Sequence, residues 1–145
     1  MSPDQTVEAA VVRLLAGREH SRAELRRKLS GRFASTELEP VLDDLAERGL
    51  QSDRRFAEAY AAMRQSRGYG PLAIRAELKQ RGVDAALIAS ALDALDPDWL
   101  AQMRGLSERK FGADPPADRK QMARRGRFLA QRGFPADLIH QLLRD

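Results

Sequence analysis

The sequence repeats one helical pattern three times, and this repetition limits the possible folds more than any other feature. The three copies align on Leu29, Leu78 and Leu129. The first copy is one residue shorter than the others, because it has no counterpart of Gly82 and Gly133. Downstream of the anchors, apolar residues recur at three matching positions: Leu38, Ile88 and Ile139; Val41, Ala91 and Leu142; and Leu42, Leu92 and Leu143. Repetition at this spacing predicts tandem helical units that share a continuous core.

Each copy is predicted to form three helices. In the second copy, Asp53 is the expected N-cap of a helix whose apolar residues recur with helical spacing, namely Phe56, Tyr60 and Met63. Pro71 suits the first position of the next helix, and Gly82 is expected to end that helix in the left-handed conformation. Asp84 is the expected N-cap of the third helix. The first copy carries a comparable signal, a capping box that begins at Ser21.

The predicted fold class is all-α, with three tandem three-helix repeats that resemble helix-turn-helix units. No segment alternates apolar and polar residues with a period of two, so we expect no strand. We assign the repeats to residues 1–50, 51–95 and 96–145, and the linkers to about residues 49–53, 94–98 and 112–117.

The sequence contains no sign of membrane insertion, secretion or disulfide formation. No apolar run approaches the roughly 20 residues that cross a bilayer. The N-terminal residues lack the basic and then apolar layout of a secretion signal. The chain also contains no cysteine. We therefore expect a cytoplasmic protein, and a monomer.

The formal net charge of +4 conceals a strong segregation of charge along each repeat. We call residues 21–32, 71–82 and 118–133 the middle segments; together they hold 14 Lys or Arg against 3 Asp or Glu. The segments that follow, 35–48, 84–93 and 135–144, hold 2 basic residues against 8 acidic ones. Because stacked repeats place equivalent helices on equivalent faces, one surface is expected to be basic and a neighbouring one acidic.

Two interpretations of the basic surface remain open. It is either an ordinary solvated face, or a surface that faces a polyanion or an acidic protein. Under the second interpretation, the partner-facing candidates lie on the middle segments and in the Gly-Tyr-Gly turn: Arg22, Arg26, Arg67, Tyr69, Arg75, Lys79, Arg124 and Arg127.

No arrangement of residues indicates catalysis, so we expect no enzyme and no cofactor. The stretch Gly68-Tyr69-Gly70-Pro71 matches neither a Walker loop nor a dinucleotide-binding turn. His20 and His140 have no second metal ligand at a usual spacing. The carboxylates near Asp43 are better explained as a solvated acidic face than as an acid–base pair.

Several of these segments resemble the RecX family, whose members regulate the RecA recombinase. The resemblance rests on DRRFAEAY (53–60), GYGPLAIRAELKQRGV (68–83), the helix at Trp99, RKFG (109–112) and RFLAQRGF (127–134). It extends over nearly the whole chain, from about residue 9 to residue 143. Ser52-Asp53 departs from the paired acids that many members carry.

The resemblance implies three tandem three-helix repeats in an elongated, curved array. It also implies binding to RecA and to RecA–single-stranded DNA filaments, along the filament groove, with suppression of ATP hydrolysis and strand exchange. Some family members bind DNA directly. Multivalent contacts along such a filament would give firm binding from individually weak sites.

Two other classes of non-enzymatic function remain as alternatives. The first is a helix-turn-helix-like DNA-binding protein that acts independently of RecA. Such proteins place a recognition helix in the major groove, usually the last of a trio, but the last segment DAALIASALD (84–93) contains no basic residue. The second is a scaffold that binds only protein, which would leave single-stranded DNA unbound at any salt concentration.

Overall fold

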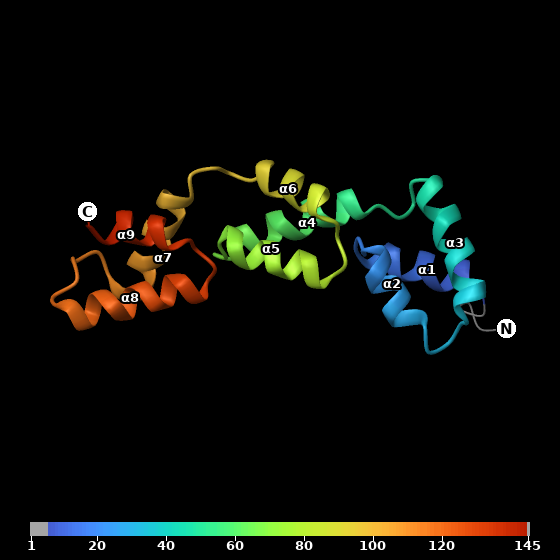
Figure 1. Ribbon diagram of the computed structural model, residues 1–145, viewed down its shortest axis with the longest axis horizontal. Coiled ribbons are helices and arrows are strands. Elements are labelled where there is room, and N and C mark those ends of the chain that lie inside the picture. The colour runs from blue at the N-terminus through green and yellow to red at the C-terminus, as the bar shows by residue number, and fades with distance from the viewer. Residues whose placement is uncertain (1–5, 145) are drawn as a thin grey trace. The chain divides into compact units, whose positions relative to one another are not determined.

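The computed structural model describes residues 6–144, and the regular secondary structure in this part of the chain is entirely helical. Figure 1 shows the succession of helices. Their bounds are α1 (Val7–Gly17), α2 (Arg22–Leu29), α3 (Ser35–Glu47), α4 (Asp53–Ser66), α5 (Pro71–Gln80), α6 (Ala85–Asp93), α7 (Trp99–Phe111), α8 (Arg119–Gln131) and α9 (Ala136–Arg144). Within residues 6–144 there is no strand, which confirms the all-α prediction.

The helices form three successive trios, but contacts divide the chain into two compact units. Unit 1 contains residues 1–60 and 78–91, and unit 2 contains residues 61–77 and 92–145. The first trio (α1–α3) therefore belongs to unit 1, and the third trio (α7–α9) belongs to unit 2. The second trio (α4–α6) contributes residues to both units.

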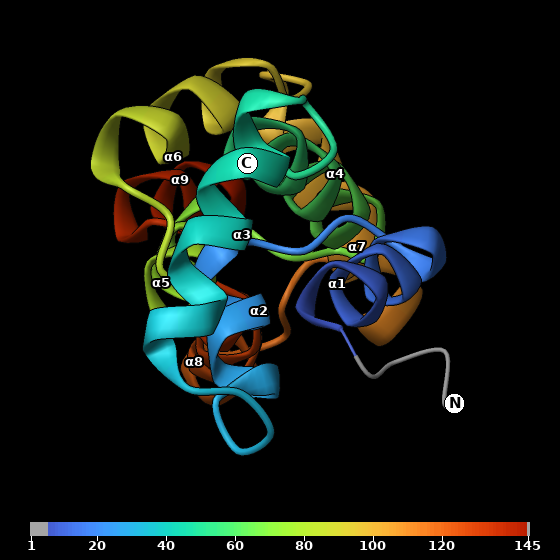
Figure 2. The same ribbon diagram turned by 90° about the vertical axis from the view of Figure 1, so that its right-hand side faces the viewer.

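The first trio encloses its own apolar core, and Figure 2 shows its three helices from their end of the chain. Leucines from α2 and α3 meet the apolar side of α1 in this core. Its buried residues are Val7, Ala10, Val11, Leu25, Leu29, Leu38, Leu42 and Leu45. Removing this much apolar surface from water is the main stabilising contribution of the trio.

The third trio has a comparable core that contains more aromatic side chains. Its buried residues are Met103, Leu129, Phe134 and Ile139. Trp99 packs against this cluster, and its ring lies edge-on to Phe134 with the ring centroids 6.2 Å apart. Trp99 is thus a packing residue at the start of α7, as its helical spacing from Met103 predicts.

Most of the predicted helix caps are confirmed, and one is wrong. The Ser21 side chain accepts from the Glu24 N–H while the Glu24 carboxylate accepts from the Ser21 N–H, which completes the capping box of α2. At α4, however, the Ser52 hydroxyl accepts the Arg55 N–H, so Ser52 is the N-cap. The Asp53 carboxylate instead accepts the backbone N–H of Arg22, at the start of α2. Asp53 therefore stabilises a neighbouring trio rather than its own helix.

In unit 1, the glycine turn after α5 lies directly against the start of α2. Gly82 has a φ of 80°, and a Cβ at this position would overlap the methyl group of Ala23. The Ser21 hydroxyl donates a hydrogen bond to the Arg81 carbonyl, with an oxygen–oxygen distance of 2.7 Å. Gly82 is therefore required both by its backbone conformation and by this close approach.

Unit 2 contains an equivalent junction, between the glycine turn after α8 and the start of α5. The N–H groups of Gly70 and Leu72 donate to the carbonyls of Arg132 and Gly133 at 2.8 and 3.0 Å. Gly133 has a φ of 93°, and a Cβ there would overlap Ala73. The Gly-Tyr-Gly-Pro stretch is thus a turn of the repeat, in which Gly70 gives the Gly133 backbone room to approach.

Candidate interaction surface

Arg22 and Arg26 on α2 form ion pairs with carboxylates of α3. Arg26 binds Glu39 through two nitrogens, Nε and Nη2, at 2.9 and 2.7 Å. Arg22 contacts Glu39 at 3.2 Å and Asp43 at 2.7 Å. The hydrogen bond from Arg26, and to a lesser degree the one from Arg22, lowers the pKa of Glu39 from its usual value to about 2. The positive charge of this pair is therefore largely compensated within the first trio.

On α5, Arg75 and Lys79 are separated by one helical turn and both side chains are exposed. Neither forms an ion pair with any residue between 6 and 144. Arg67, in the turn that precedes α5, is likewise exposed and without an ion-pair partner in that range. These three cations remain available to an external anion.

Arg124 and Arg127 on α8 are also exposed. The Arg124 guanidinium lies 5.7 Å from the centre of the Phe111 ring, which restrains its position without neutralising its charge. Arg127 makes no ion pair with the described part of the chain. The middle segment of the third trio therefore keeps the positive character that its sequence predicts.

Tyr69 lies between two guanidinium groups of unit 2. Arg64 is 3.6 Å and Arg132 is 4.7 Å from the centre of its ring. Arg64 is in turn held by Glu77, with Nε and Oε1 2.8 Å apart. Because its ring is in contact with these two cations, Tyr69 has a packing role at the junction of α5 and α8.

Sequence reasoning missed other exposed cations, some of them on the middle segment of the third trio and others outside the middle segments. Six of these lack an ion pair with the described residues and lie on α4, α7, α8 and α9: Arg54, Arg109, Lys110, Arg119, Lys120 and Arg144. Their exposure follows from helical spacing relative to the buried residues, so a face-by-face count of each helix could have found them. Within residues 6–144, no helix has the length and apolar character that crossing a bilayer requires.

Three successive helix trios define a tandem three-helix repeat protein. The sequence matches family models described as the first, second and third three-helix domains of RecX, at residues 9–45, 52–92 and 96–143. The chain belongs to the RecX family.

Named relatives and solved structures agree with this assignment. Regulatory protein RecX of Halorhodospira halophila is 47% identical over 136 residues, which covers 93% of this chain and 84% of the relative. Regulatory protein RecX of Pseudomonas putida (strain GB-1) is 50% identical over 131 residues, which covers 90% and 84%. The crystal structure of RecX from Lactobacillus salivarius superposes with a TM-score of 0.79 at 22% identity, over 95% of this chain and 92% of that one. At this identity the superposition establishes the shared fold.

Proposed function

We propose that this protein binds RecA and RecA–single-stranded DNA filaments in the cytoplasm as a monomer, and that it inhibits the ATPase and strand-exchange activities of the recombinase. Membership of the RecX family supports the choice of partner. The proposed contact residues are the exposed cations Arg67, Arg75, Lys79, Arg124 and Arg127.

The observation that carries the proposal is the exposed stripe of Arg75 and Lys79 on α5. In the first trio the matching basic stripe, Arg22 and Arg26, is held by the carboxylate of Glu39. Leaving two exposed cations without counter-charge brings no stabilisation to the fold, whereas it provides attraction to phosphates or to an acidic protein surface. Arg22 and Arg26 belong to the proposed surface as well, but with a weaker contribution because their charge is compensated.

The test is a titration of the protein into RecA, ATP and single-stranded DNA, with ATP hydrolysis as the readout. The wild-type protein is expected to suppress hydrolysis. The double variant Arg75→Glu, Lys79→Glu is expected to need at least about tenfold more protein for the same suppression, since each reversed contact at a desolvated site costs on the order of 1 kcal/mol or more. Full inhibition by this variant would remove α5 from the contact surface.

The matched control is the double variant Arg54→Glu, Arg109→Glu, which makes the same change in net charge on α4 and α7. It is expected to inhibit hydrolysis as the wild type does. Equal losses in both double variants would mean that net charge, rather than a defined surface, governs binding.

The same variants distinguish the DNA-binding alternative. We measure binding of the protein to labelled single-stranded and duplex DNA, without RecA, by fluorescence anisotropy. The dependence of the affinity on salt concentration reports the contacts to phosphates. Tight, sequence-dependent duplex binding together with unchanged ATP hydrolysis by RecA would favour a DNA-binding protein that acts independently of the recombinase.

A further inference from the structure

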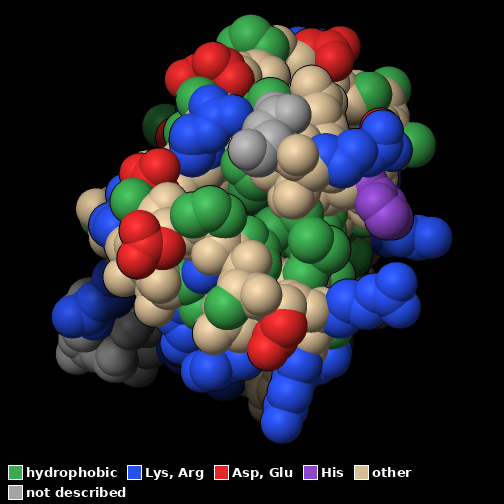
Figure 3. Space-filling view, turned by 90° about the vertical axis from the view of Figure 1, so that its left-hand side faces the viewer, with side chains coloured by type: hydrophobic (Ala, Val, Ile, Leu, Met, Phe, Trp, Pro, Cys, Tyr) green, Lys and Arg blue, Asp and Glu red, His purple; other side chains and the backbone are tan. Residues whose placement is uncertain are grey.

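The third trio carries a hollow between α8 and α9 that is lined mainly by apolar side chains. Its volume is about 510 Å³. Figure 3 shows hydrophobic side chains gathered on the end of unit 2 that carries these helices, with Lys and Arg side chains at their border. The residues that line the hollow are Met122, Ala123, Gly126, Ile139, His140, Leu143 and Arg144.

Gly126 keeps the floor of this hollow open. A Cβ built on Gly126 would lie 3.7 Å from Leu143 Cδ1 and 3.8 Å from Ile139 Cγ2, which is ordinary van der Waals contact. The backbone therefore does not require glycine here, and glycine inside a helix costs about 1 kcal/mol relative to alanine. What glycine provides at this position is access to the apolar side chains of α9.

The repeat alignment identifies the matching surface of the first trio, where ion pairs occupy this position. Met122 and Gly126 correspond to Arg22 and Arg26, and His140 and Arg144 correspond to Glu39 and Asp43. In the first trio these four charged side chains bind one another across α2 and α3. In the third trio the arginines of the middle helix are replaced by an apolar and a small residue, and the carboxylates of the last helix by basic ones.

The border of the hollow carries two arginines that have no ion-pair partner among the described residues. Arg144 lines the hollow, and Arg119 lies one turn before Met122 and Ala123 on α8. Neither arginine forms an ion pair with the described residues. On α9 the one acid is Asp137, which is exposed and two turns before Arg144.

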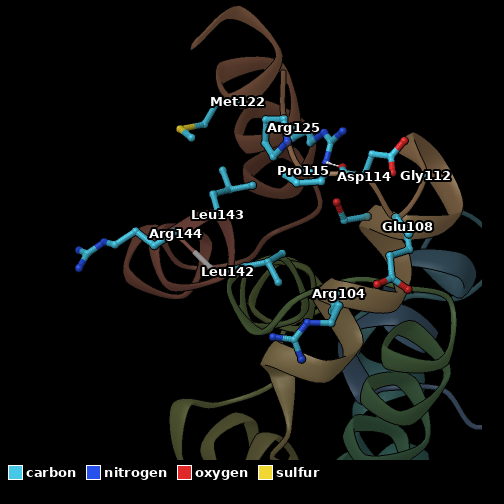
Figure 4. Close-up of a pocket in the computed structure, with 13 residues that line it drawn as sticks. Arg104, Glu108, Gly112, Asp114, Pro115, Met122, Arg125, Leu142, Leu143 and Arg144 are labelled. Carbon is cyan, nitrogen blue, oxygen red and sulfur yellow. Dashed lines mark hydrogen bonds between the residues drawn. The ribbon is translucent and has the colours of Figure 1, made fainter. Parts of the chain in front are cut away.

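A second hollow, of about 490 Å³, shares Met122, Leu143 and Arg144 with the first and continues toward α7. It is more polar: Arg125, 9% exposed, donates to the Asp114 carbonyl at 2.9 Å. Figure 4 shows Arg144 extending away from Arg125 and Asp114. Carboxylates of Glu108 and Asp114 already lie on this side, so an incoming acid is favoured at the Arg144 end.

We propose that the hollow between α8 and α9 binds an acidic amphipathic helix of a partner protein. Apolar side chains of that helix, spaced by three or four residues, enter the hollow and contact Ile139 and Leu143. Its flanking carboxylates pair with Arg144 and Arg119, and so supply from outside the negative charge that α3 supplies in the first trio. The proposal is independent of RecA binding by the cations of α5.

A peptide with the sequence of α3, Ser35–Glu47, acetylated and amidated, is a suitable probe because it is amphipathic and carries the acids Glu37, Glu39, Asp43, Asp44 and Glu47. Binding of the fluorescently labelled peptide to the full chain is measured by anisotropy. We expect saturable binding that weakens with salt. A second peptide with every Glu and Asp replaced by Lys is expected not to bind. No binding of the acidic peptide at about 1 mM would overturn the proposal.

Two variants locate the binding site on the protein. Gly126→Leu fills the hollow and is expected to weaken peptide binding at least tenfold, whereas Gly126→Ala, whose methyl group covers only a small part of Leu143 and Ile139, is expected to weaken binding much less. The double variant Arg119→Glu, Arg144→Glu changes two exposed residues. It is expected to bind the acidic peptide at least tenfold more weakly than the wild type does, and to bind the lysine peptide. Arg54→Glu is the charge control on α4. Unchanged peptide affinity in the charge-reversed double variant would overturn the assignment even if Gly126→Leu does not fold.

The alternative is that a second copy of this protein occupies the hollow. Sedimentation velocity of the full chain without peptide tests this alternative. The wild type is expected to remain monomeric over the concentrations used for peptide binding. A dimer that Gly126→Leu abolishes would mean that the hollow binds another copy of the chain, and would overturn the proposal of an acidic partner helix.

Discussion

At the scale of single residues, His20 is the clearest case of a side chain whose chemistry is set by tertiary contacts. It is 2% exposed, its Nδ1 donates to the Arg18 carbonyl at 3.0 Å, and Lys28 donates to its Nε2 at 3.1 Å. Because lysine can only donate, the imidazole is neutral with its proton on Nδ1. Burial first, and then the positive charges of Arg18 and Lys28, lower the pKa of His20 below 6.5.

The lowered pKa of His20 predicts a loss of stability at mildly acidic pH. Below about pH 6.5 the unfolded chain takes up a proton at this imidazole that the folded chain does not, so acid favours unfolding. The free energy of unfolding should therefore fall as pH decreases from 7.5 to 5.5, by at most about 1.4 kcal/mol per pH unit. Urea unfolding followed by circular dichroism at several pH values measures this dependence.

The comparison that isolates His20 is between the variants His20→Gln and His140→Gln. His140 is exposed, so its removal should leave the pH dependence of the wild type in place. His20→Gln should make the free energy of unfolding less dependent on pH between 5.5 and 7.5, whatever its effect on the absolute stability. A curve unchanged by His20→Gln would mean that another group is responsible.

At the scale of elements, the two glycine turns bear on a difference between the repeats. The second and third copies carry Gly82 and Gly133, and the first copy has no counterpart of them. Gly82 and Gly133 each allow the end of one middle helix to approach an alanine at the start of the preceding one, Ala23 and Ala73. In the turn after α2, a Cβ on Gly31 would meet nothing within 4 Å, so this turn has no such close neighbour among the described residues. The absence of a counterpart of Gly82 and Gly133 in the first copy is consistent with this open turn.

Gly133→Ala is predicted to destabilise unit 2 by about 1–3 kcal/mol, because a side chain at a φ of 93° is strained and its Cβ overlaps Ala73. Chemical denaturation measures the change. Gly31→Ala is the matched control in the first trio, since a Cβ on Gly31 meets nothing within 4 Å and its φ lies outside the left-handed region.

Adding Ala73→Gly to Gly133→Ala isolates the part of this strain that comes from the Ala73 methyl group. The double variant removes the overlap with the Ala73 methyl group but keeps the unfavourable φ and the close approach to the Ala73 backbone, so it should recover part of the lost stability. Equal stability of Gly133→Ala and the wild type would show that the junction relaxes without cost.

At the scale of the whole molecule, helix trios and compact units do not coincide. Residues 61–77 of the second trio pack with the third trio in unit 2. The Gly70 and Leu72 N–H groups bond the turn after α8, and Gln65 exchanges two hydrogen bonds with the backbone of Asp96 at 2.9 and 3.2 Å. The third trio is therefore completed by part of the second.

A fragment of residues 51–145 is predicted to unfold cooperatively, whereas residues 96–145 alone should be at best marginally stable. The shorter fragment loses the bonds to residues 61–77 and has the small core of a chain of about 50 residues. Thermal unfolding by circular dichroism distinguishes the two. A shorter fragment with the same midpoint as the longer one would show that the third trio is an independent domain.

The sequence by itself determined the helices, because their limits depend on local signals. Ser21, Pro71, Asp84, Gly82 and Gly133 act on backbone groups within one turn of themselves, and the apolar spacing fixes which face of each helix is buried. The repeat and its missing glycine were equally visible, since both are patterns of residue identity.

Only the tertiary structure decided which charges stay available. Arg26 meets Glu39 across 13 residues of sequence, and Asp53 bonds the start of a helix 31 residues away instead of capping its own. Tyr69 is held by Arg132 from the next trio. Electrostatic and hydrogen-bond energies depend on distances between atoms, and helical spacing fixes such distances within one helix but not between helices.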